Sequence, residues 1–318
     1  MSPMDPLRNA DPARWGLVPA VDVREYFPEP DPVLAHALSE ARMGRWRHAA
    51  ALIAEAVHDW DGRAHVVGAL AEVGARDDTW LTRWRSELPD DPHLAVVDAE
   101  AWVRLAWEVR GSAPDWETSD EHLRAFQRVL RRAETAAEHA VEAFPEDPTP
   151  WWSLVMVASG LDYEHERFGP IWDGLTARAP SHRAGHERAL GYWSERWCGS
   201  HDLAFAFAER ATSPSLAALP LHAALETVED DPAAWRSPLV LTALDAVLAR
   251  DFVDDRPSRA DRGCAVLALV DNHRHAEAVE QFRLLGPHAD GEPWRHFPDP
   301  KEAFLVVRAE ACLKAGRP

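Results

Sequence analysis

The hydrophobic and polar positions of the chain do not alternate as they do in β-strands. β-Branched and aromatic residues never alternate with polar ones over a run of six, and Ala, Leu, Glu and Arg fill most segments. This pattern predicts an all-α protein. The expected helices are Pro32–Met43, Trp46–Asp59, Arg63–Gly74, Thr79–Leu88, Pro92–Val109, Ser119–Phe144, Pro150–Leu161, Glu164–Arg178, His182–Cys198, His201–Ala211, Leu216–Val228, Pro238–Ala249, Arg259–Asp271, His275–Leu285 and Pro300–Lys314.

Asp-Pro pairs mark where several of these helices are expected to begin. The aspartate can accept a hydrogen bond from an amide of the first turn, and the proline has no amide to leave unpaired. The pairs are Asp31-Pro32, Asp91-Pro92, Asp147-Pro148, Asp231-Pro232 and Asp299-Pro300.

The first 30 residues have a different composition. They contain six prolines, which keep the backbone extended and remove amide donors. Trp15, Val18, Val21, Tyr26 and Phe27 are too apolar for a free tail. We therefore expect residues 1–30 to form an arm that packs along the first helices, and residues 31–318 to form a single helical domain.

Small residues surround a turn in the stretch ALSEARMGRWRHAAALIAEAV, where Gly44 lies at the turn and Ala49 on the following helix. The stretch VLALVDNHRHAEAVEQFRLL has the same pattern, with Asn272 at the turn and Ala278 after it. Small residues let two antiparallel helices approach, and Gly or Asn can adopt the left-handed conformation that ends a helix.

Both stretches resemble tetratricopeptide repeats. Pro145 and Pro180 lie 35 residues apart, close to the ~34 residues of one such repeat. The resemblance implies an irregular α-solenoid of antiparallel helical hairpins, whose concave side binds a protein or peptide. Long insertions at 111–118, 250–258 and 286–298 interrupt the period.

The chain is strongly acidic, with 34 Lys and Arg against 53 Asp and Glu and a net charge of −19. Such a field repels phosphate backbones and anionic lipids, so we expect neither a nucleic-acid nor a membrane partner. It attracts a basic protein, although the acidic residues can equally serve solubility alone. Only Lys301 and Lys314 are lysines, an arginine bias that suggests a GC-rich bacterial genome.

Cysteine usage and the N-terminal sequence bear on location. The three cysteines are far apart, with no CxxC pair, which fits reduced thiols in a cytoplasm. The chain shows neither a signal-like start nor a long apolar stretch. We therefore expect a cytoplasmic protein.

Aromatic and histidine residues concentrate between positions 151 and 201. On the helix expected from His182, the residues His182, His186, Trp193 and Trp197 share one face. Polar-tipped rings suit the wall of a groove, although a packing role between helices is the plainer alternative. The candidate groove residues are Trp151, Trp152, Tyr163, His182, His186, Trp193, Trp197 and His201.

His182 and His186 also have the i, i+4 spacing of two metal ligands on a helix, and Glu187 or His201 could supply a third. The HExxH motif is absent and chance pairs are expected among 16 histidines. We therefore predict no metal and no cofactor. The cluster Glu164-His165-Glu166 is explained by the favourable interaction of carboxylates with a helix start.

Signatures of catalysis are missing, because the chain has no Gly-rich phosphate loop and no GxSxG elbow. Cys198 lies close to His201 in sequence, but a small residue at a helix end needs no catalytic explanation. We predict no catalytic residue and favour a non-catalytic module that binds a protein or peptide, with a basic partner. Two alternatives stay open: a small-molecule-binding protein or enzyme that uses the aromatic, His-rich groove, and an acidic inhibitor or immunity-type protein.

Overall fold

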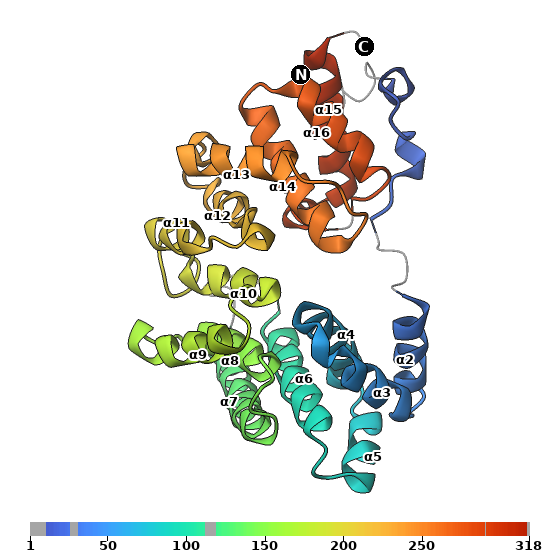
Figure 1. Ribbon diagram of the computed structural model, residues 1–318, viewed down its shortest axis with the longest axis vertical. Coiled ribbons are helices and arrows are strands. Elements are labelled where there is room, and N and C mark those ends of the chain that lie inside the picture. Colours follow the sequence, from blue (N-terminus) through green and yellow to red (C-terminus); the bar gives the residue numbers. More distant parts are fainter. Residues whose placement is uncertain (1–10, 26–30, 112–118, 290, 317–318) are drawn as a thin grey trace. The chain divides into compact units, whose positions relative to one another are not determined.

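The computed structural model describes residues 11–25, 31–111, 119–289 and 291–316. Within these ranges the chain is built from α-helices and short 3₁₀ turns, and one isolated β-bridge is the sole strand-like pairing (Figure 1). The predicted all-α class is confirmed. The chain divides into two compact units, so the stretch expected as one domain over 31–318 belongs to both. The first unit is Glu29–Ser200, and the second is Met1–Pro28 together with His201–Pro318.

The first unit is a succession of helices that pack on their sequence neighbours. The even-numbered helices also contact one another in order, α2 with α4, α4 with α6, α6 with α8 and α8 with α10. The helices are α2 (Pro32–Arg42), α3 (Arg47–Glu55), α4 (Trp60–Arg76), α5 (Thr79–Glu87), α6 (Pro92–Arg110), α7 (Asp120–Ala143), α8 (Thr149–Gly160), α9 (His165–Arg178) and α10 (Arg183–Trp193).

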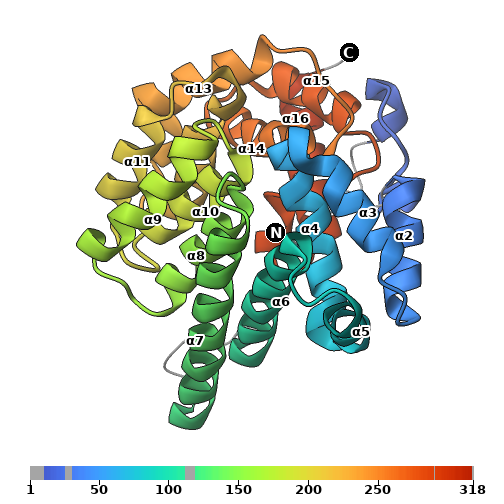
Figure 2. The same cartoon turned by 60° about the horizontal axis from the view of Figure 1, so that its bottom comes forward.

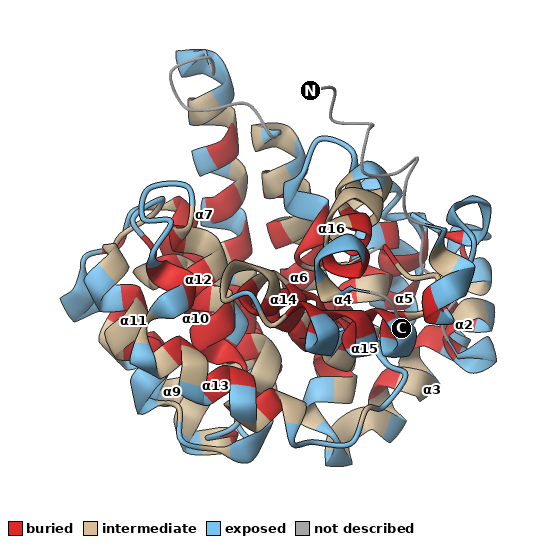
Figure 3. Ribbon diagram, turned by 90° about the horizontal axis from the view of Figure 1, so that it is seen from above, coloured by how far each residue is buried: buried red, intermediate tan, exposed pale blue. Residues whose placement is uncertain are grey.

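Helices α6 and α7 lie side by side as an antiparallel pair (Figure 2). One side of α7 is buried and the other is exposed, as the colouring of Figure 3 shows. The buried positions follow alternating spacings of four and three residues, which place them on one helix face. They are Phe126, Leu130, Ala133, Ala137 and Ala140.

The second unit carries the remaining helices around its own core. They are α11 (His201–Arg210), α12 (Leu219–Thr227), α13 (Pro238–Leu248), α14 (Arg256–Asp271), α15 (His275–Leu285) and α16 (Pro300–Ala315). Phe282, Trp294 and Phe304 meet at ring-centroid distances of 5.0–6.2 Å in this core. Among the described residues, no helix combines the length and the apolar character needed to span a membrane.

The N-terminal segment packs on the core of the second unit, whereas the sequence predicts that it packs along the first helices. Trp15 is buried, and its carbonyl accepts a hydrogen bond of 2.7 Å from the Arg283 guanidinium. Arg24 forms the isolated β-bridge, donating to the Pro287 carbonyl at 2.7 Å and accepting from the Ala289 amide at 2.9 Å. Closeness in sequence does not decide which apolar surface a segment covers. Tyr26 and Phe27, also expected in this packing, lie outside the described residues.

The Asp-Pro pairs begin helices at most of the expected places. Asp31, Asp91 and Asp299 accept amide hydrogen bonds at the starts of α2, α6 and α16. Asp147 accepts from the Thr149 amide at 2.8 Å, where α8 begins. Asp231 instead precedes only a 3₁₀ turn over Ala234–Arg236, because a cap can start a turn that the following residues do not extend.

Candidate functional site

The histidine and tryptophan stripe predicted from His182 to Trp197 does not form one open helix face. His182 and His186 are 2% and 5% exposed, and Trp193 is half-buried. Helix α10 ends at Trp193, after which Ser194 takes an extended backbone. Trp197 therefore lies in the turns beyond the helix. The open groove wall was the wrong interpretation for His182 and His186, which belong to the interior.

Local hydrogen bonds explain why the two histidines are buried. His182 caps α10, because its Nδ1 accepts from the Gly185 amide at 3.0 Å and its Nε2 donates to the Trp60 carbonyl at 3.2 Å. His186 donates from Nδ1 to the His182 carbonyl at 2.9 Å. Burial lowers the pKa of both imidazoles, so both are neutral at neutral pH.

Trp151 and Trp152 also pack between helices. Trp152 is buried, its indole N–H donates to the Ala184 carbonyl at 3.2 Å, and the Arg188 guanidinium lies 3.3 Å from its ring centroid. Trp151 packs on α9, where a Cβ added at Gly174 would come within 2.4 Å of the indole. Neither ring lines the pocket described below.

Arg188 is also part of a buried charge cluster that ties α6, α8 and α10 together. Its Nη2 lies 2.5 Å from Oε1 of the fully buried Glu100, which also pairs with Arg104 at 2.9 Å and accepts from the Ser153 hydroxyl at 2.8 Å. Burial alone would raise the pKa of Glu100, but the two guanidinium charges hold it below its usual range. The cluster fixes the two helices, α8 and α10, whose ends lead into the pocket.

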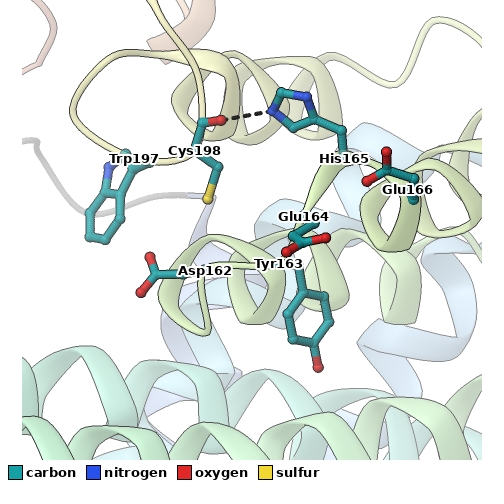
Figure 4. Close-up of a pocket in the computed structure, with 7 residues that line it drawn as sticks. All are labelled: Asp162, Tyr163, Glu164, His165, Glu166, Trp197 and Cys198. Carbon is teal, nitrogen blue, oxygen red and sulfur yellow. Dashed lines mark hydrogen bonds between the residues drawn. The ribbon is translucent and has the colours of Figure 1, made fainter.

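An open pocket of about 480 Å³ lies between the α8–α9 connection and the segment that follows α10 (Figure 4). Of the predicted groove residues, Tyr163 and Trp197 line it, whereas His201 belongs to the other unit. The full lining is Asp162, Tyr163, Glu164, His165, Glu166, Trp197 and Cys198.

The chain turns sharply into the pocket at Asp162, whose φ of 51° is a left-handed conformation that Asp tolerates better than most residues. Glu164 then takes the N-cap position of α9. His165 joins the two pocket segments, because its Nε2 lies 2.8 Å from the carbonyl oxygen of Cys198 and donates to it (Figure 4). The Trp193 ring packs on the same imidazole at 4.6 Å.

The rim of the pocket is acidic. Asp162, Glu164 and Glu166 are all exposed, and within the described ranges Glu164 and Glu166 form no ion pair. Tyr163 is buried and donates its hydroxyl to Glu134, so the aromatic contribution of the rim comes mainly from half-buried Trp197. Carboxylates and an indole in the lining of one pocket are groups that can bind a cation.

Cys198 is not activated for nucleophilic attack. Burial and the charge of Asp162 raise the pKa of its thiol to about 11, so the thiol is protonated at neutral pH. His165 contacts the carbonyl of this residue and not its sulfur. The division of the chain places Cys198 and His201 in different units.

No family model, curated protein or solved structure matches this chain. The tetratricopeptide resemblance therefore stays a prediction, and a function has to be argued from the chemistry of the site.

Most of the rim was not predicted from the sequence. The carboxylates of Glu164 and Glu166 were predicted to serve the helix start, and Asp162 was not among the predicted site residues. One available signal was the run from Asp162 to Glu166 at a predicted interhelical turn. Three of its five residues carry carboxylates. Trp197 follows Asp162 by 35 residues, and it joins the same pocket because α8 and α10 pack together. No local sequence pattern predicts this.

Proposed function

We propose that the protein is a non-catalytic binding module that holds a cationic side chain of a basic protein or peptide in this pocket. The observation that carries the proposal is that the Asp162, Glu164 and Glu166 carboxylates and the Trp197 ring all line one open depression, with Asp162 on the side of the indole (Figure 4). A guanidinium can pair with carboxylates through its N–H groups while its flat face lies on an indole.

The chain itself shows that the Trp197 ring accepts such a group. The Arg110 guanidinium lies 5.3 Å from the ring centroid, and Trp107 meets the ring edge-on at 5.0 Å. These contacts hold the indole in place, and Trp197 also lines the pocket. A cation–π contact at a partly exposed site is worth roughly 0.5–1 kcal/mol, so the carboxylates supply most of the selectivity.

The charge of the whole chain supports a basic partner. A net charge of −19 attracts a cationic protein over a distance and speeds its encounter, and the attraction weakens as salt is added. The contacts that link every second helix from α2 to α10 support a stacked-hairpin scaffold of the tetratricopeptide kind for this module. An acidic inhibitor of a basic toxin is one form that such a module can take.

Nucleophilic catalysis is less well supported at this site, because the Cys198 thiol stays protonated and its neighbouring imidazole is bonded elsewhere. A depression open to solvent suits a protruding side chain of a partner better than it suits a reaction that excludes water.

The proposal is tested by calorimetric titration with an arginine-rich peptide at low salt. We expect the triple variant Asp162→Asn/Glu164→Gln/Glu166→Gln to bind the peptide at least about tenfold more weakly, since each lost charge-assisted contact costs on the order of 1 kcal/mol. The matched control is Glu138→Gln/Glu142→Gln/Glu146→Gln, which removes three exposed carboxylates of the same unit and the same net charge.

The control should weaken binding by less than about threefold, because it changes only the long-range field. Equal weakening in both variants would show that net charge, and not the pocket, attracts the peptide. Parent protein that does not bind the peptide would contradict a basic partner.

A further inference from the structure

A Cys–His–Asp chain lies in the second unit, far in sequence from the acidic pocket. Helices α12 and α14 pack against each other. The Cys264 sulfur lies 3.8 Å from Nδ1 of His222, and Nε2 of the same ring lies 3.0 Å from Oδ1 of Asp261. Asp261 and Cys264 are three residues apart on α14, so they share the helix face that meets His222.

The hydrogen bonds define which atoms donate and which accept along the series Cys264, His222 and Asp261. A carboxylate accepts only, so Nε2 of His222 carries the proton that Asp261 accepts. In the neutral ring Nδ1 is then the acceptor, and it faces the Cys264 sulfur. This is the arrangement in which an imidazole takes a proton from a nucleophile while a carboxylate holds the ring and stabilises its charged form.

Burial opposes ionisation of the Cys264 thiol less than it opposes ionisation of an isolated buried thiol. Cys264 is 0% exposed, and burial raises the pKa of its thiol, although the His222 charge opposes that shift. Burial also disfavours a charged His222, but the Cys264 thiolate and Asp261 raise its pKa well above the usual value. A proton that moves from sulfur to Nδ1 stays inside the pair, so the net buried charge does not change.

Cys312 provides an internal comparison. It lies in the same unit and is 1% exposed, so it is as deeply buried as Cys264. Its charged neighbours are Arg308 and Arg283, and a guanidinium cannot take the thiol proton. The two cysteines therefore differ in chemistry while matching in burial. The His222 side chain, which contacts the Cys264 sulfur, is 11% exposed.

We propose that Cys264 is a modification site that reacts with small, uncharged hydroperoxides, with His222 as its base and Asp261 as the group that positions that base. The Cys264 proton moves to Nδ1, and the sulfur attacks one peroxide oxygen. An S–O bond forms, the O–O bond breaks, and the leaving hydroxide, or the alkoxide of an organic hydroperoxide, takes the proton from Nδ1. With hydrogen peroxide the products are the Cys264 sulfenic acid and water; sulfur is oxidised and the peroxide is reduced.

Oxidation at this position has a structural consequence. Cys264 is buried in the packed core of the second unit, to which α12, α14 and α15 contribute residues. An added oxygen has to be accommodated by displacement of these neighbours, and overfilling a core is destabilising. Modification of Cys264 therefore lowers the melting temperature of the second unit.

The test treats folded, full-length protein with hydrogen peroxide for stepped times, quenches it with catalase, and alkylates the remaining thiols after denaturation. Mass spectrometry then gives the oxidation rates of Cys264 and Cys312 in the same molecules. We expect Cys264 to react about tenfold faster or more, a threshold set below the roughly 10²–10⁴-fold that a positioned base typically supplies. The excess of the Cys264 rate over the Cys312 rate should grow as the pH rises, because the Cys264–His222 pair then loses its first proton.

The variants His222→Gln and Asp261→Asn separate the roles. The first should bring the Cys264 rate down to that of Cys312, and the second, which keeps an acceptor for Nε2, should reduce the excess several-fold. Because transient opening exposes both thiols, the ratio of the two rates corrects for any loss of stability. A parent ratio near one contradicts the proposal, and so does an unchanged ratio in either variant that folds. If His222→Gln does not fold, the parent and Asp261→Asn ratios decide.

Discussion

At the scale of single residues, the first unit holds charges that are completely sealed from water. The Arg63 and Asp147 side chains are both 0% exposed, and their Nη2 and Oδ2 atoms lie 2.6 Å apart. Arg63 also donates to the Ile53 carbonyl, and Asp147 accepts from the Thr149 amide. Every strong polar group of the pair is therefore engaged, which is the condition under which a buried ion pair is tolerated.

Removing one member of this pair should be costly. Arg63→Met keeps most of the side-chain volume but leaves the Asp147 carboxylate buried without its cation, so we expect urea unfolding to show a loss of about 3–5 kcal/mol. The control is Arg76→Met on the same helix, where the ion pair with Glu72 is exposed. It should cost less than about 1 kcal/mol. Similar losses in both variants would show that the buried pair has no special weight.

The same residues show which interactions can be predicted from the sequence and which cannot. The predicted place of Asp147 at a helix start is confirmed, because capping depends on amides two or three positions away. Its pairing with Arg63 joins positions 84 apart and has no local signal. Tyr163 and Trp197 were named as site residues from their type, but the carboxylates beside them acquire their meaning only when α8 and α10 pack.

At the scale of elements, the N-terminal segment completes the core of the second unit. Trp15, Leu17 and Val23 are buried in that core, and the Arg308 guanidinium donates to the Val18 carbonyl at 2.9 Å. A segment from one end of the chain thus covers helices from the other end. Its apolar side chains and its backbone acceptors both contribute to this attachment.

Two valines of this segment offer a matched comparison. Val23 is 3% exposed and Val21 is 82% exposed. Val23→Ala removes buried methyl groups and should destabilise the second unit by about 1–3 kcal/mol, whereas Val21→Ala should stay within about 0.5 kcal/mol. Differential scanning calorimetry measures both. If the two variants melt alike, the segment does not stabilise the unit in solution.

Helix existence was predictable and helix ends were less so. Each predicted helix corresponds to one of α2 to α16, because propensity and caps act within a few residues. The helix expected over His182–Cys198 stops at Trp193, where Ser194 turns the chain and donates its hydroxyl to the Gly191 carbonyl at 2.7 Å. That early stop moves Trp197 off the helix and into the pocket wall.

At the scale of the whole molecule, the excess of 53 acidic over 34 basic residues provides attraction without specificity. A diffuse negative field would draw a cationic peptide to many places on the surface. The pocket adds specificity only if its carboxylates and Trp197 act together at one position. The distinction between a field and a site is therefore the decisive question about this protein.

That question is answered by the NMR chemical-shift changes of the labelled protein during titration with an arginine-rich peptide. If the pocket is the binding site, the largest changes fall on the backbone amides of residues 162–166 and 197–198 and on the Trp197 indole N–H. Those changes should disappear in Asp162→Asn/Glu164→Gln/Glu166→Gln. Changes of equal size around Glu138, Glu142 and Glu146, or changes in the pocket that survive the triple substitution, would contradict the proposed site.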